Sequence, residues 1–249
     1  MDFAGGIVVH ATAGTAALVT ALTLGKRRGF PKSITPPHSP ILTMIGASML
    51  WIGWFGFNAG SALGANGGAG MAMLVTHISA ATASLVWMFI EWKRFGKPSL
   101  IGIVTGMVAG LATVTPASGY IGVPGGLILG FLGGLLCYLA VDYIRGKLQI
   151  DDSLDVFAVH GVGGIIGTLL VAFLATSTFS GLGLAEGQTG VSQFIFQLKA
   201  VHLSVVWTSF FTYLILKLTS LIVSLRVDEQ EEIEGLDLRS HGEKGYHSD

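Results

Sequence analysis

Residues 155–177 read DVFAVHGVGGIIGTLLVAFLATS, an apolar run whose single charged residue stands at its first position. A helix of this length spans the ~30 Å hydrocarbon core of a bilayer at ~1.5 Å per residue. Further apolar runs of this kind follow one another along the chain, and strand-like alternation is absent. The predicted spans are 3–25, 41–62, 69–92, 99–116, 122–144, 155–177 and 193–225. The sequence therefore predicts an all-α, polytopic membrane protein with seven spans, the last of them long enough to be tilted.

Composition supports this fold class and excludes several functions. Of the 249 residues, 51% are hydrophobic and 12% are charged, about half the charge of a soluble domain, and the mean hydropathy is +0.68. The 36 glycines suit closely packed membrane helices. A net charge of −1 and the lack of a basic groove element argue against nucleic-acid binding. The single cysteine, Cys137, excludes a disulfide framework and a cysteine zinc site, so neither a metal nor a cofactor is predicted.

The basic residues lie in alternate loops and so predict the orientation of the chain. Lysine and arginine residues follow spans one, three, five and seven, whereas the connections at 63–68, 117–121 and 178–192 contain none. Lys199 is the only basic residue near that second side. The positive-inside rule then puts the N-terminus outside and the C-terminus in the cytoplasm. We divide the chain into a membrane domain, residues 1–226, and an acidic cytoplasmic tail, residues 227–249.

Two predicted spans carry a histidine within a similar short motif. Val9-His10 and Val159-His160 are each followed by small residues, and the predicted orientation makes the two spans antiparallel. Such pairs are typical of inverted-repeat transporters, whose site lies between the repeats near the midplane. Small neighbours leave the imidazoles uncovered and favour exposure to a narrow lumen. The alternative is that each histidine binds a backbone carbonyl and joins helices. A metal site is disfavoured, because the motifs contain neither a cysteine nor a His-x-x-x-His pair and too few acceptors are nearby.

Four other residues could contribute to a site. Phe57 and Ser61 end the second span near the outer mouth, where an aromatic ring either belongs to the interfacial belt or attracts a cation. Asp155 opens a span and is predicted to cap the helix. For Asp2, capping competes with an electrostatic role towards a cation in the pore. His77 and His202 are interpreted as packing or interface residues.

The motifs around these residues resemble those of the ammonium transporters (the Amt/Mep/Rh family). The resemblance rests on Asp2–His10 with the small residues that lead to Arg27, on Trp51–Ser61, on 155–164 and on 235–246. It implies an ammonium-transporter-like bundle, a homotrimer with one pore per subunit, and a tail that works with a PII-type cytoplasmic protein. It also implies residue roles: His10 and His160 are the twin pore histidines, Phe57 belongs to the outer gate, and Ser61 and Asp2 serve ammonium recruitment.

The resemblance predicts transport rather than enzymatic catalysis. Ammonium would be recruited outside a plasma (cell inner) membrane, deprotonated, and conducted as ammonia past the histidines, with a proton relay between them. The family usually has eleven spans, and this sequence corresponds to the last seven, so we expect the C-terminal part of a longer transporter. The alternatives are an ammonium sensor that signals through its tail, a non-conducting fragment and, last, an intramembrane metalloenzyme.

Overall fold

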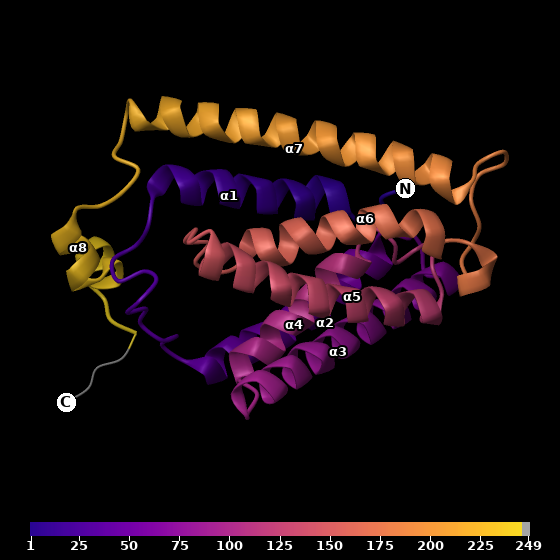
Figure 1. Ribbon diagram of the computed structural model, residues 1–249, viewed down its shortest axis with the longest axis horizontal. Helices are drawn as coiled ribbons and strands as arrows, with labels where there is room; N and C mark the ends of the chain where they lie inside the picture. The colour runs from indigo at the N-terminus through magenta and orange to yellow at the C-terminus, as the bar shows by residue number, and fades with distance from the viewer. Residues whose placement is uncertain (246–249) are drawn as a thin grey trace.

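The computed structural model describes residues 1–245, and within this range every regular element is a helix (Figure 1). The last four residues of the predicted tail lie outside the described residues. The principal helices are α1 (Thr12–Leu24), α2 (Pro40–Gly60), α3 (Gly67–Phe95), α4 (Leu100–Val114), α5 (Val123–Val141), α6 (Val162–Leu174), α7 (Gly190–Ser220) and α8 (Glu229–Glu234). The chain also has four π-helical segments, η1 (Gly6–Ala11), η2 (Asp142–Lys147), η3 (Phe157–Gly161) and η5 (Asp237–His241), and one 3₁₀ turn, η4 (Ser177–Phe179), among the described residues. The predicted all-α membrane fold is confirmed.

Within residues 1–245, six helical segments are long and apolar enough to cross a membrane. They are Gly6–Leu24, Pro40–Gly60, Gly67–Phe95, Val123–Lys147, Phe157–Leu174 and Gly190–Ser220. Two of them begin with the π-helical turns η1 and η3, which run directly into α1 and α6. The chain is thus a multi-pass membrane protein.

The fourth predicted span, 99–116, contains a shorter apolar helix, α4, whose 15 residues are fewer than those of the six segments above. Most of α4 is buried against α2, α3, α5 and α6. Its apolar sequence therefore reflects burial among other helices as well as lipid, which hydropathy alone does not distinguish.

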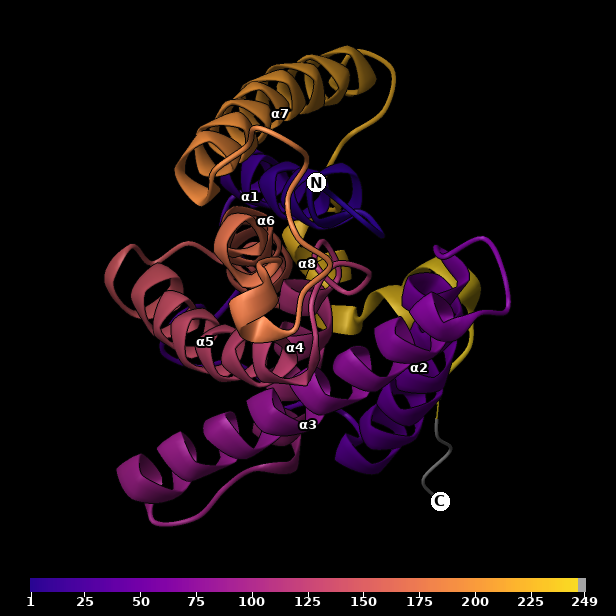
Figure 2. The same cartoon turned by 90° about the vertical axis from the view of Figure 1, so that its right-hand side faces the viewer.

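Helices α3, α4 and α5 pack most extensively and form the centre of the bundle (Figure 2). The buried Ser79 of α3 donates a hydrogen bond to the carbonyl of Gly110 in α4, at 2.8 Å. A Cβ added at Gly130 of α5 would lie 2.6 Å from the Ser79 carbonyl oxygen, so only glycine permits this approach. Small residues thus bring the three backbones together, as is usual where lipid leaves no hydrophobic drive for helix association.

Polar side chains fix where several helices begin. Ser39, Asn66 and Ser99 each accept a backbone N–H from the first turn of the next helix, and Thr189 forms a capping box with Ser192. Such caps satisfy amides that have no partner within the helix. They place the helix ends alternately at the two ends of the bundle.

The segments η1–α1 and η3–α6 lie side by side, with α1 against η3 and α6 against η1, and α7 flanks α1, in both views (Figures 1 and 2). The loop after α1 and the short helix α8 of the tail meet at one end of the molecule. This end also carries the loop between η2 and η3, so the basic loops 25–39 and 142–156 and the tail share one side, as the charge pattern predicts.

Candidate functional site

Asp2 and Asp152 hold the two histidine-bearing segments in the same way. The Asp2 carboxylate accepts the backbone N–H groups of Gly6 and Ile7, at 2.5 and 3.0 Å. The Asp152 carboxylate accepts those of Val156 and Phe157, at 2.9 and 2.7 Å. Each aspartate thus binds the amides four and five residues later, and each stands eight residues before its histidine. The structural repeat therefore pairs Asp2 with Asp152.

Asp155 does not cap its helix, so this prediction is wrong. Its backbone is left-handed, with φ of 55°, and its carboxylate forms an ion pair with Arg145 at 3.1 Å. Burial raises the pKa of Asp155 to about 6, against the opposing charge of Arg145. The sequence placed the cap at the last aspartate before the apolar run, whereas the π-helical turn moves it three residues earlier, to Asp152.

Close packing of the two repeats brings the histidines together. A Cβ on Gly14 would collide with the backbone of Gly161, and one on Gly164 would lie 2.6 Å from the His10 Cβ. Gly14 and Gly164 stand four residues after His10 and His160, so the two contacts follow the same pseudo-symmetry. The helices can cross at this distance only because these residues are glycine.

The two imidazoles are in contact, as the antiparallel arrangement predicts. Nδ1 of His10 lies 3.1 Å from Nδ1 of His160, so one ring donates and the other accepts, depending on the tautomers. His10 is 1% exposed, and its Nε2 finds no hydrogen-bond partner among the described residues. No group of three potential metal ligands occurs in the described part of the chain. The pair therefore offers a buried nitrogen atom to a small molecule.

Aromatic rings of α2 cover the histidine pair. The indole of Trp54 stacks on His10 with ring centroids 5.2 Å apart and an angle of 13° between the planes. Phe57 meets His10 edge-on, at 6.1 Å between centroids. A cavity of about 380 Å³ follows this surface and is lined by Val9, His10, Ala13, Leu50, Gly53, Trp54, Phe57, Val156 and His160. Its wall is apolar except at the imidazoles and the indole.

The other predicted site residues lie apart from this cavity. Ser61 follows the end of α2, and its hydroxyl donates to the carbonyl of Phe57 at 2.8 Å. Among residues 1–245, no hydrogen bond or ion pair joins Ser61 to Asp2. The structure thus joins His10, His160 and Phe57 in one site, and it leaves Asp2 at the start of η1 as a ligand of backbone amides.

Sequence reasoning missed Asp152 and Trp54. The identical spacing of eight residues in Asp2–His10 and Asp152–His160 could have identified the first. Trp54 stands one helical turn before Phe57 and so shares its face, which could have indicated the second.

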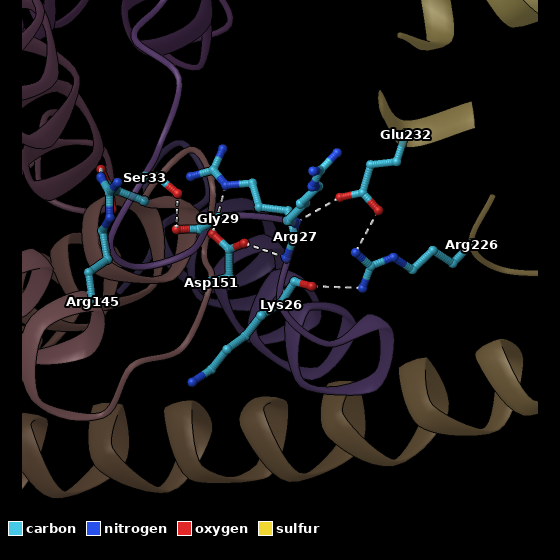
Figure 3. A network of polar contacts seen from close by, with 10 residues as sticks. Lys26, Arg27, Gly29, Ser33, Arg145, Asp151, Arg226 and Glu232 are labelled. Atoms are coloured by element: carbon cyan, nitrogen blue, oxygen red, sulfur yellow. Dashed lines mark hydrogen bonds and ion pairs between the residues drawn. The ribbon is translucent and has the colours of Figure 1, made fainter. Parts of the chain in front are cut away.

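A polar network at the basic end joins the tail to the membrane helices (Figure 3). Arg27 binds Asp151 through its backbone N–H, at 2.8 Å, and its side-chain Nε, at 3.2 Å. Glu232 of α8 accepts the Arg28 backbone N–H at 2.9 Å and pairs with Arg226 at 2.7 Å. The Arg28 amide and then Arg226 lower the pKa of Glu232. Arg226 also donates to the carbonyls of Leu24, the last residue of α1, and Lys26, just beyond it.

Comparison with known protein families gives a match over almost the whole chain. A sequence model described as the Ammonium Transporter Family matches residues 1–246. The ammonium transporter Amt1 of Archaeoglobus fulgidus is 48% identical over 249 residues, which are 99% of this chain and 62% of the relative. An ammonium transporter of Aquifex aeolicus is 44% identical over 247 residues, 99% of this chain and 57% of the relative. The chain therefore spans about three fifths of the length of these relatives.

Solved structures share the fold. A structure described as a "Sensor Amt Protein" superposes with a TM-score of 0.88 at 31% identity, over 97% of this chain and 60% of that one. Mep2 of Candida albicans superposes with a TM-score of 0.82 at 36% identity, over 93% of this chain and 53% of that one. The similarity thus covers the helices that carry His10 and His160.

Proposed function

Because this chain belongs to the ammonium transporter family, we propose that it takes part in moving ammonium across a membrane and conducts ammonia past His10 and His160. The observation that carries the proposal is the buried contact between the two imidazoles, 3.1 Å apart, beside an apolar cavity. The family membership supports the substrate. The sequence resemblance supports the same pair of residues.

The apolar wall favours a neutral molecule over an ion. An ammonium ion that enters such a lumen loses its hydration at a cost of several kcal/mol, whereas ammonia does not. Ammonia can still accept and donate hydrogen bonds, and the unpaired Nε2 of His10 offers a partner for it. A proton left by ammonium could pass along the imidazole pair, which would titrate as a coupled unit.

Recruitment and gating involve the outer end of α2 in this proposal. Phe57 contacts His10 edge-on and so closes one side of the cavity, as a gate residue would. Ser61 lies one turn further out and would offer its hydroxyl to an arriving ammonium ion. Asp2 would act through its negative charge and through the backbone of η1, because both of its carboxylate oxygens hold amides.

The assembly and location follow from the same resemblance. We propose a homotrimer in the plasma (cell inner) membrane, with the C-terminus cytoplasmic. A PII-type regulatory protein would bind at the basic end, where the tail meets the loops. The proposal requires no cofactor or metal.

A sensor is the second candidate function. A solved structure similar to this chain is described as a "Sensor Amt Protein". In this chain the tail helix α8 contacts the loop after α1 through Glu232, so occupancy of the membrane domain could change the tail. A tail deletion that abolishes signalling but spares growth on low ammonium would favour the sensor.

The test of transport is His10→Ala or His160→Ala in membrane vesicles that contain the full chain. We expect each variant to lose most methylammonium flux, or to lose discrimination against potassium, because the substitution removes an imidazole from the otherwise apolar lumen. His77→Ala is the control, since His77 lies away from the cavity and stacks on Trp51. Unchanged flux and ion selectivity in both pore variants would exclude the proposed relay.

A further inference from the structure

Trp54 forms one wall of the cavity, and its indole N–H points to a partner outside that cavity. Nε1 donates to the hydroxyl of Thr115 at 3.0 Å, and both side chains are buried. The indole nitrogen can donate one hydrogen bond and accept none, so the bond to Thr115 satisfies it completely. The ring can then present an unbroken apolar face to His10, 13° from parallel.

Thr115 is held ready to accept this bond. It follows the last residue of α4, and its hydroxyl lies 2.7 Å from the carbonyl oxygen of Leu111 and 3.3 Å from Oδ1 of Asn58. A hydroxyl has one proton, and the shorter contact to Leu111 is the better acceptor for it. The lone pairs of the oxygen therefore remain for the indole of Trp54.

Asn58 and Thr76 continue the network behind Thr115. Asn58 donates through Nδ2 to the hydroxyl of Thr76 at 2.9 Å, and Thr76 donates in turn to the carbonyl of Ala72 at 2.6 Å. Asn58, Thr76 and Thr115 are each 0% exposed. The other side-chain acceptor next to the Thr115 hydroxyl is Oδ1 of Asn58, 3.3 Å away, and the indole donates to Thr115 rather than to it.

Trp54 lies between a buried cluster and the cavity. It belongs to a buried apolar cluster with Ala47, Ala80, Val104, Met107 and Leu111. The near side faces the cavity of about 380 Å³ beside His10. A buried N–H without a partner is costly inside a membrane protein, so an indole released from Thr115 would turn towards the cavity.

We infer that Thr115 is a positioning residue for the pore: its hydroxyl holds the Trp54 indole flat against His10 and keeps the indole N–H out of the path of the substrate. The inference rests on the proposed function, because it concerns the same pore. It adds a residue at the end of a further helix, α4, to a site otherwise built from η1, α1, α2 and η3. The backbone of Thr115–Pro116 also accepts the N–H groups of Ala4 and Phe3, and side-chain variants leave these bonds in place.

Thr115→Val removes the hydroxyl and keeps the shape of the side chain. We expect the maximal rate of methylammonium uptake into vesicles to fall on the order of tenfold, with little change in the apparent KM, because the outer end of α2 is untouched. Thr115→Ser should restore the rate. Thr113→Val is the matched control: Thr113 is also buried in α4, and its hydroxyl donates to the carbonyl of Ala109 in its own helix.

A double-mutant cycle with Trp54→Phe tests whether Thr115 acts on the transport rate through the Trp54 indole. Phenylalanine keeps a ring beside His10 but has no N–H, so Thr115→Val should cause no further loss in this background. If Thr115→Val lowers the rate by the same factor with and without the Trp54→Phe substitution, the inference is overturned. The indole resonance of Trp54, identified by its absence in Trp54→Phe, should shift in Thr115→Val and return in Thr115→Ser.

The same measurements separate this inference from the proposed function. If His10→Ala changes nothing, or wild-type vesicles take up no methylammonium, the proposed function fails, and the indole resonance still decides whether Thr115 holds Trp54. If His10→Ala abolishes uptake while Thr115→Val behaves like the wild type, the inference about Thr115 alone is wrong. If Thr115→Val does not fold, the rate of Trp54→Phe decides: a wild-type rate overturns the inference, and a reduced rate supports it.

Discussion

At the scale of single residues, carboxylates determine how the histidines are presented. Asp2 and Asp152 each bind two backbone amides of a π-helical turn, and the histidine follows at the same distance in the chain. A π-helical turn carries one more residue than an α-helical turn, and such turns often occur at functional sites. Asp155, which is nearer to His160 in sequence, pairs instead with Arg145.

Asp152→Ala should weaken both stability and transport. The amides of Val156 and Phe157 would lose their acceptor, at a cost of about 1–2 kcal/mol, and the η3 turn would no longer fix His160. Thermal unfolding in detergent and methylammonium uptake measure the two effects. Ser153→Ala, at the exposed neighbouring position, is the control. A variant that unfolds and transports like the wild type would show that the carboxylate is dispensable.

At the scale of elements, the crossing of α1 and α6 depends on glycine. The similar motifs and opposite orientation of the two helices predict that they pair. That the crossing point lies at Gly14 and Gly161 is visible only when the helices are packed. The histidines meet because His10 lies one turn before Gly14 and His160 directly precedes Gly161, so the packing of two elements sets the distance of 3.1 Å between the imidazoles.

Gly14→Ala tests this dependence. The added methyl group would overlap the backbone of Gly161 and force the helices apart, with a loss of about 1–3 kcal/mol in stability and a larger loss in transport. Gly46→Ala on α2 is a matched control, because a Cβ there meets nothing within 4 Å. That substitution should be neutral or slightly stabilising in a helix. Equal unfolding temperatures for the two variants would contradict the assigned crossing.

At the scale of the whole molecule, charge gathers at one end and joins the tail to the membrane helices. Glu232, Arg226 and Arg28 connect α8 with the loop after α1, and Arg27 connects that loop with Asp151. Asp151 directly precedes Asp152, which holds the η3 turn. The contacts in Figure 3 thus link the tail to Asp151, the neighbour in sequence of the residue that holds the turn before His160.

The docking of the tail should depend on pH through Glu232. Its pKa is lowered in the docked tail, so the ionised carboxylate favours docking at neutral pH. This contribution is fully present above the ordinary pKa of 4.5 and is lost as the pH falls through the lowered value. Glu232→Gln should accelerate tryptic cleavage of the tail at pH 7 by no more than about fivefold, since exposed ion pairs are weak.

Glu229→Gln is the control for the tail, because it changes the same charge in the same helix and no ion pair of Glu229 is found in residues 1–245. With pepsin in place of trypsin, the difference between the Glu232→Gln variant and the wild type should be small below pH 4.5, because the wild-type carboxylate is then losing its charge. Identical cleavage of all three proteins at pH 7 would contradict the role of Glu232.

The sequence by itself determined the helical membrane fold, the side on which the basic loops lie and the two histidines. These features depend on hydropathy, charge and short motifs, which act along the chain and need no knowledge of packing. The tertiary structure decided that α4 is buried among four other helices, that Asp152 rather than Asp155 holds the turn before His160, and that Trp54 covers His10. Each of these depends on contacts between residues far apart in the chain or on the pitch of a local turn, and neither follows from composition or spacing alone.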